Sequence, residues 1–222
     1  MNGFFSGNNK LFRFCTFALD IVVLSLMWIV CSLPVITIGP ATAALYYSCV
    51  KCLRYQEPGP YTNFISSFKE NLRTGVGLTI VFLIVAVLLR GGYQLLDGVF
   101  PDSGTVSALV MMAYLLFLLF PIGVFSCAVA LLSRFGYSVG GLIRDSIRIT
   151  FKHLSRLLLV AVVNTAAVIL SVRYFYFLVW LVIPAADALI VSRFIEPLLR
   201  RYTPKLEELE ELPPEERPWY LR

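Results

Sequence analysis

Long apolar runs separated by short charged segments dominate the hydrophobic pattern of this chain. A helix that crosses the bilayer core needs roughly 20 consecutive apolar residues. Four runs meet that requirement: Phe14–Ile36, Gly75–Leu96, Val106–Leu132 and Tyr174–Ile195. A fifth run, Leu157–Val172, is shorter but spans if Arg156 and Arg173 extend to the two interfaces. Because backbone amides in lipid must be bonded internally, the pattern predicts an all-α bundle of about five membrane-spanning helices.

Two connecting segments carry an apolar stripe at helical spacing. In the first, Phe64, Phe68 and Leu72 fall at i, i+4 and i+8. The second stripe consists of Leu142 or Ile143, Ile147, Phe151 and Leu154. Each indicates a short amphipathic helix at the inner membrane surface. The predicted contacts to lipid or a partner protein are Lys69, Arg73, Arg144, Arg148 and Lys152. The alternative is that each stripe packs on the protein's own bundle.

Proline falls at a similar place in three of the runs. The three dipeptides are Leu33-Pro34, Phe120-Pro121 and Ile183-Pro184, and each is followed by small residues and a basic, aromatic end. This gives a loose internal repeat over residues 14–97 and 104–172, with a half unit at 174–202. Proline removes a helical hydrogen bond, so we expect three kinked helices around two straighter ones. Such repeats are typical of transporters that bind solutes near the helix breaks.

The composition supports a membrane location. Of 222 residues, 58% are apolar and 15% are charged, and the mean hydropathy is +0.78. A soluble domain of this size needs more polar surface to cover its core. The composition therefore excludes a cytosolic enzyme, a disulfide-rich secreted domain and a disordered regulator. It predicts a multi-pass protein of the cell membrane, with the membrane domain at residues 1–202.

The net charge of +5 is divided unevenly along the chain. Residues 1–202 hold sixteen Lys or Arg and eight Asp or Glu, whereas residues 203–222 hold three and six. The cations lie between apolar runs, which the positive-inside rule explains better than a nucleic-acid surface. No nucleic-acid partner is expected. Both basic connections and the acidic tail at 203–222 are therefore predicted to be cytoplasmic.

The number of spans decides which charged residues can meet. Five spans place the N-terminus outside, despite Lys10 and Arg13, and bring Asp20 to the depth of Arg90. A sixth crossing over residues 40–55 would return the N-terminus to the inside and move Asp20 toward Asp187. That segment offers only about 16 Å of apolar helix at about 1.5 Å per residue. We therefore predict five spans, with six or a re-entrant hairpin as the alternative.

Signatures of catalysis and of metal binding are absent from the sequence. Cys49 and Cys52 form a C-x-x-C pair without a second ligand pair or a thioredoxin-like context. The one histidine, His153, has no second histidine and no carboxylate arranged around it. No enzymatic function, metal or cofactor is predicted.

Polar residues within the apolar runs are the strongest candidates for function. A charged side chain at mid-bilayer costs about 2.5–3.5 kcal/mol on insertion scales, so it is expected to face protein or water. The segment 34–40 adds two prolines and a glycine that cannot form a regular helix. The predicted polar pocket comprises Asp20, Pro34, Thr37, Gly39, Pro40, Thr42, Arg90, Asn164 and Asp187. The charged and amide members could bind a solute or relay a proton, or they could join helices by hydrogen bonds.

One stretch of the chain has a recognisable motif. It includes a first helix with Trp28, then Leu33-Pro34, the sequence Gly-Pro-Ala-Thr-Ala-Ala-Leu at 39–45, Lys51, Arg54 and later Phe68-Lys69 before a span. This pattern resembles the YesL-like family of bacterial multi-pass membrane proteins, whose function is unknown. Members are typically encoded near carbohydrate uptake and degradation systems, so the resemblance implies a role alongside sugar import. It carries no established site residues.

Two functions follow as hypotheses. The first is an accessory or regulatory component associated with carbohydrate uptake, which would dock on a sugar transporter or sensor through its amphipathic segments and acidic tail. The alternative is a stand-alone carrier or channel for a small solute, which the proline breaks and the charged residues within the spans favour.

Overall fold

The computed structural model describes residues 10–99, 104–173 and 180–202 and is helical over these ranges, with no strand among them. Its elements are α1 (Lys10–Ser32), a 3₁₀ turn (Val35–Thr37), α2 (Ile38–Ser48), a π-helical turn (Cys49–Arg54), α3 (Pro60–Val99), α4 (Thr105–Leu132), α5 (Val139–Lys152), α6 (Leu154–Arg173) and α8 (Ile183–Arg201). The predicted all-α fold is confirmed.

Four of the described helices are long and apolar enough to cross a membrane, namely α1, α3, α4 and α6. They correspond to four of the five predicted runs. The fifth run, Tyr174–Ile195, is not one continuous helix: residues 174–179 lie outside the described part, and α8 begins only at Ile183. Pro184 therefore occupies the first turn of a helix, where its missing N–H costs nothing, and does not kink a span.

Helix α3 differs from its prediction because it continues without a break for 40 residues. The amphipathic segment at residues 64–72 and the following span were expected as separate helices. Phe64 is fully buried and stacks with Phe68, so this part of the stripe packs on the protein and not on a membrane surface. Lys69 and Arg73, the predicted surface contacts here, are exposed.

The proline at residue 34 ends α1, as predicted. The Thr37 hydroxyl lies 2.6 Å from the carbonyl oxygens of both Cys31 and Pro34, and as a single donor it satisfies one at a time. Pro121, by contrast, lies inside a continuous α4. The expectation of three proline-interrupted helices is therefore right at Pro34 and at Pro184, where a turn at residues 181–182 precedes α8, and wrong at Pro121.

Helix α2 and the π-helical turn form the buried centre of the structure. Eight of the eleven residues of α2 are buried, and it packs against α1, α3, α4 and α8. This is the segment that the six-span alternative treated as a crossing. Within the described residues, α2 is a short helix enclosed by protein. The π-helical turn that follows it is also buried, and irregular backbone is tolerated at membrane depth only where protein surrounds it or it lines a cavity.

Helices α2 and α3 cross at two glycines. A Cβ atom on Gly39 would lie 2.5 Å from the Gly75 carbonyl oxygen, and one on Gly75 would lie 2.8 Å from Pro40 Cα. Thr79 Oγ1 accepts a 2.9 Å hydrogen bond from Gly39 N and donates one of 2.9 Å to Gly75 O. Gly39 and Pro40 therefore serve helix packing and not the polar pocket in which they were predicted.

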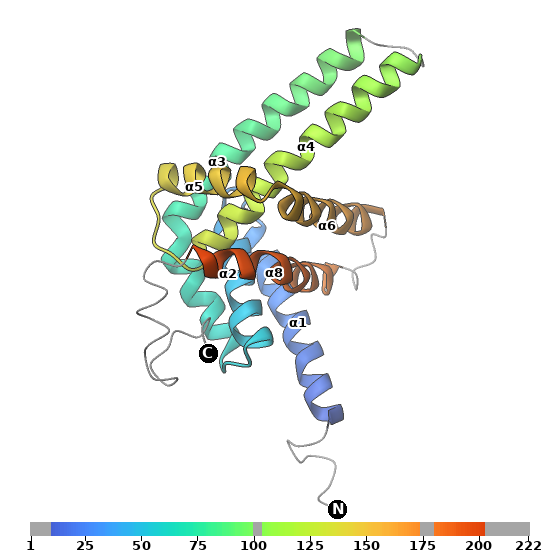
Figure 1. The fold of residues 1–222 in the computed structure, drawn as a ribbon. Helices are drawn as coiled ribbons and strands as arrows, with labels where there is room; N and C mark the ends of the chain where they lie inside the picture. Colours follow the sequence, from blue (N-terminus) through green and yellow to red (C-terminus); the bar gives the residue numbers. More distant parts are fainter. Residues whose placement is uncertain (1–9, 100–103, 174–179, 203–222) are drawn as a thin grey trace, which may run out of the picture.

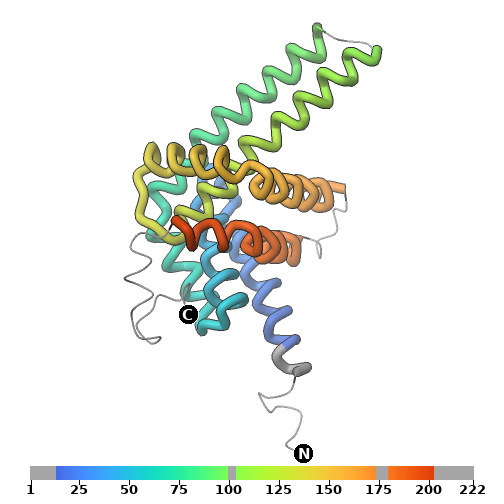
Figure 2. The backbone as a smooth tube through the Cα atoms, viewed as in Figure 1, coloured from blue at the N-terminus to red at the C-terminus, as the bar shows by residue number. Residues whose placement is uncertain are grey.

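The remaining helices surround this centre. Figure 1 shows α3 and α4 as a hairpin that projects well beyond the other helices. Helices α6 and α8 lie side by side, at an angle to this hairpin. Figure 2 shows α1 extending in the opposite direction from the hairpin tip. The largest buried cluster joins residues of α2, α4, α5 and α8, and a smaller one joins α1 and α2 to the start of α8.

Candidate binding cavity

A cavity of about 420 Å³ lies among α1, α2, α4, α6 and α8. Most of its wall is aliphatic or aromatic, and Trp28, Tyr46, Phe125 and Trp180 contribute rings. The other polar side chains that line it are Thr42, Ser126, Asn164, Thr165, Ser171 and Asp187. An apolar cavity with a few convergent polar groups is the usual form of a small-molecule site.

Asp187 is the charged residue of this cavity. Its Oδ1 atom is buried and accepts no hydrogen bond from the described residues, and no ion pair to it occurs among them. The side chain lies in the first turns of α8, whose Ala185 N–H donates to Ser25 Oγ of α1 at 3.3 Å. An unpaired buried carboxylate oxygen is unfavourable, so this atom marks a position where a partner would be stabilised.

A buried ionic cluster adjoins the cavity through Tyr46. The Tyr46 hydroxyl donates to Glu196 Oε1 at 3.0 Å, and Glu196 forms an ion pair with Arg134. The side chains of Arg134 and Glu196 are 1% and 4% exposed. One turn away, Arg54 donates to the Ser192 carbonyl at 2.8 Å. The cluster thus joins the end of α4 and the π-helical turn to α8.

The sequence reasoning missed Glu196, although the residue pattern contains a signal. Ala188, Ser192, Glu196 and Leu199 recur at three- or four-residue spacing and share one buried face of α8. A glutamate on the face of small and apolar residues is rarely buried without a partner, and Arg134 supplies that partner. The identity of Arg134 could not be inferred, because it lies 62 residues earlier in the chain.

Three of the predicted pocket residues come together here, namely Thr42, Asn164 and Asp187. Pro34 and Thr37 lie at the turn between α1 and α2, outside the cavity lining. These two residues therefore shape the helix break and do not face the same space as Asp187.

Asp20 lies apart from the other charged residues of the predicted pocket. Its Oδ1 accepts a hydrogen bond of 2.6 Å from the Tyr61 hydroxyl, near the start of α3. The predicted pairing with Arg90 is therefore wrong, because neither of the ion pairs among the described residues includes Asp20. Counting the spans could not identify Tyr61 as the partner, because this residue was assigned to a polar segment between two spans.

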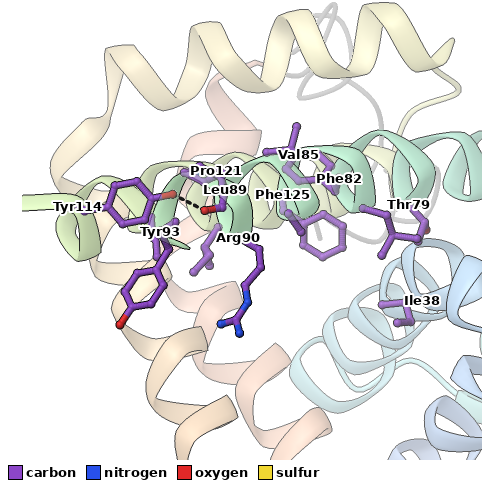
Figure 3. Close-up of a pocket in the computed structure, with 14 residues that line it drawn as sticks. Ile38, Thr79, Phe82, Val85, Leu89, Arg90, Tyr93, Tyr114, Pro121 and Phe125 are labelled. Carbon is purple, nitrogen blue, oxygen red and sulfur yellow. Dashed lines mark hydrogen bonds between the residues drawn. The ribbon is translucent and has the colours of Figure 1, made fainter. Parts of the chain in front are cut away.

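Arg90 lines a second, more open space of about 540 Å³ between α3 and α4. Figure 3 shows Arg90, Tyr93 and Tyr114 toward one end of this groove, and Thr79 and Ile38 at the other. The Tyr114 hydroxyl donates to the Leu89 carbonyl. Apart from these groups the wall is apolar, and Ile38 and Phe125 also line the Asp187 cavity.

Helix α5 (Val139–Lys152), with Ser138 at its N-cap, includes the second predicted stripe except for Leu154, which begins α6. Its buried face, however, consists of Leu142, Ser146, Ile149 and Thr150. Three residues of the predicted stripe, Ile147, Phe151 and Leu154, are instead exposed. Phe151 nevertheless contacts the bundle, because its ring centroid lies 5.0 Å from that of Phe120 on α4. The predicted contact residues Arg144, Arg148 and Lys152 are exposed beside them.

The cysteine pair lies within the protein and not at a ligand site. Cys49 and Cys52 are buried free thiols, and Cys52 Sγ accepts a hydrogen bond from Asn63 Nδ2 at 3.4 Å. Across the described ranges, no group of three or more His, Cys, Asp or Glu residues is placed to hold a metal ion.

Part of the chain matches the model of a known family. The family model described as "Protein of unknown function, DUF624" matches residues 21–92, which run from α1 through most of α3. No curated protein and no solved structure matches the chain. The match includes the Gly39–Gly75 crossing, but its description gives neither an activity nor the YesL-like name. Over residues 21–92 the chain is therefore similar to an uncharacterised family, and its four long apolar helices indicate a membrane location.

Proposed function

We propose that this protein binds a small polar solute inside the membrane, in the cavity that Asp187 lines. One observation carries the proposal: a carboxylate oxygen is buried at the cavity wall without a hydrogen-bond partner among the described residues. A bound ligand that satisfied this oxygen would offset its desolvation, which costs about 1–3 kcal/mol or more for a charged group. The volume of about 420 Å³ also falls within the usual range for ligand pockets of about 300–1,000 Å³.

The surroundings of the cavity favour a carrier over an open channel. Tyr46 lines the cavity and is held by Glu196, which in turn is held by Arg134. This buried cluster joins the cavity wall at Tyr46 to α8 through a charged, hydrogen-bonded contact. In a carrier, such a contact separates on one side of the solute at a time, whereas a permanent channel would keep a continuous water path.

Tryptophan fluorescence offers a direct binding test. The chain has three tryptophans, and Trp28 and Trp180 line the cavity. Replacing the third, Trp219→Phe, leaves an emission signal that comes from the cavity wall alone. The purified protein in lipid nanodiscs is then titrated with a panel of cationic, neutral and anionic solutes. We expect a saturable change in emission for at least one class.

A matched pair of variants decides whether binding occurs in this cavity. Ala167 lines the cavity, whereas its neighbour Ala166 is exposed on α6. Ala167→Leu fills part of the space and should abolish the saturable change, and Ala166→Leu should leave it intact. A saturable change that survives Ala167→Leu, or no change with any solute class, would refute the proposal. Flux into proteoliposomes by the same variants then tests for transport.

The exposed face of α5 favours a second function, that of an accessory component associated with carbohydrate uptake. Phe151 is 66% exposed and Arg148 is 72% exposed on the same helix. Exposed aromatic and cationic groups side by side can contact another membrane protein. Phe151→Ser combined with Arg148→Gln should release a co-purifying transporter, whereas Arg173→Gln, at an exposed position at the end of α6, should not. Retention of the partner by the α5 variant would refute this function. The acidic tail at 203–222 lies outside the described residues.

A further inference from the structure

We infer that the solute is a small organic cation with N–H donors, bound by the Asp187 carboxylate. This inference rests on the proposed function and adds the chemical class of the ligand. Its basis is the inventory of hydrogen-bonding groups in the cavity wall: the side-chain donors are used within the protein, whereas acceptor capacity remains on the hydroxyl oxygens and on Asp187 Oδ1.

The hydroxyl groups of the wall donate to the backbone of their own helices. Each bonds the carbonyl oxygen four residues earlier, at 2.6–2.8 Å: Thr42 to Ile38, Ser126 to Ile122, Thr165 to Ala161 and Ser171 to Ala167. A hydroxyl has one proton to donate and two lone pairs that accept. These four side chains can therefore accept hydrogen bonds from a ligand but cannot donate any to it.

The N–H groups of the wall are used in the same way. Asn164 Nδ2 donates to the Val160 carbonyl at 2.8 Å and to Ser126 Oγ at 3.3 Å. Trp28 Nε1 donates to Thr42 Oγ1 at 3.2 Å, and Trp180 Nε1 donates to the Ser171 carbonyl at 3.0 Å. Together with Tyr46, which donates to Glu196, every donor-bearing side chain of the described wall has an internal acceptor.

The charge of the cavity wall also favours a cationic ligand. Asp187 is the one carboxylate among the lining residues, and neither lysine nor arginine is among them. An anionic solute would meet a carboxylate without compensating donors. A neutral polyol could donate to Asp187, but its own oxygens would lack donors in return. An ammonium or amidinium group donates, carries no acceptor and neutralises the carboxylate.

The aromatic side chains of the wall are also suited to a cation. Trp28, Tyr46 and Trp180 all line the same space. Aromatic rings attract a desolvated cation through their negative faces, and tryptophan does so most strongly. With Phe125, the wall therefore combines one carboxylate with four aromatic residues, which is unlike a site for a phosphorylated sugar.

A matched set of probes tests the ligand class. The Trp219→Phe protein in phosphatidylcholine nanodiscs is titrated with 2-phenylethylammonium, 2-phenylethanol, phenylacetate and glucose. We expect saturable binding of the ammonium compound at least tenfold tighter than that of any other probe. Asp187→Asn should weaken ammonium binding at least tenfold, and Asp187→Glu should restore most of it. Asp97→Asn, at an exposed position near the end of α3, is the matched control and should leave it unchanged.

The outcomes separate this inference from the proposed function. Binding of glucose or of 2-phenylethanol that equals ammonium binding, blocked by Ala167→Leu but unaffected by Asp187→Asn, would overturn the cation inference and leave a solute cavity. Tighter binding of phenylacetate would also overturn it. No saturable binding of any probe would count against both. Because Asp187→Asn removes a buried charge, its loss of binding is checked against an unchanged unfolding transition.

Discussion

The contact between α2 and α3 allows a quantitative prediction about Gly39. In Gly39→Ala the added Cβ would lie 2.5 Å from the Gly75 carbonyl oxygen, which is backbone and cannot rotate away. The two helices must therefore separate locally. Separation also lengthens the hydrogen bond from Gly39 N to Thr79 Oγ1, now 2.9 Å. We expect the variant to be less stable than the parent protein.

The magnitude follows from three contributions. Overpacking a well-packed contact costs about 1–3 kcal/mol. A weakened hydrogen bond adds about 0.5–1.5 kcal/mol. The higher helix propensity of alanine returns up to about 1 kcal/mol, and less in the first turn of a helix, where Gly39 lies. The net expected loss is about 2 kcal/mol in the free energy of unfolding, a combination of these three contributions.

Reversible unfolding by sodium dodecyl sulfate in mixed micelles, followed by circular dichroism, measures this difference. Gly91→Ala on α3 is the matched control, because no atom apart from the adjoining residues and backbone of its own helix lies within 4 Å of the Cβ it would add. The free energy of unfolding of this control should equal that of the parent protein or exceed it by up to about 1 kcal/mol. The packing argument fails if Gly39→Ala is as stable as Gly91→Ala.

Three further predictions concern charged groups. Glu196→Leu alone should lower the free energy of unfolding by about 3–5 kcal/mol in the same assay, because breaking a buried pair leaves one unpaired charge. Adding Arg134→Met removes that charge and should restore most of the lost stability. A double variant as unstable as Glu196→Leu would contradict this. The pKa of His153 should lie below its usual range because of partial burial and then the neighbouring cations, so Lys152→Gln should raise it in an NMR titration. Because folding favours the neutral imidazole, stability should fall as the pH drops through that pKa, and His153→Gln should lessen this fall. Arg148→Gln should weaken retention of phosphatidylglycerol, relative to phosphatidylcholine, by about 1 kcal/mol in native mass spectrometry; unchanged retention would exclude a lipid contact.

Much of the fold could be predicted from local pattern. Apolar run length identified α1, α3, α4 and α6 as spans, and Pro34 located the end of α1. These features depend on neighbouring residues alone. The continuity of α3 was missed because a charged, amphipathic first half and an apolar second half suggest separate environments, although both halves are helical.

The candidate site was predictable only in part. Asn164 and Asp187 stood out because polar groups in apolar runs are costly. Which of them face one another depends on helix crossings that no spacing rule supplies. Asp20 therefore seemed able to reach Arg90 or Asp187, whereas its partner is Tyr61. Similarly, Gly39 looked like part of a pocket because only the crossing with Gly75 shows what its missing side chain accommodates.

The uninterrupted length of α3 gives the molecule a lever arm. If the close contact of Gly75 with Pro40 served as the pivot, the arm would run from there to Val99 without a proline. Those 24 residues extend about 36 Å at about 1.5 Å per residue. A tilt of about 10° at the pivot would displace the far tip by roughly 6 Å, from the same helix rise. Small changes in how α2 is seated would thus be magnified at the end of the hairpin.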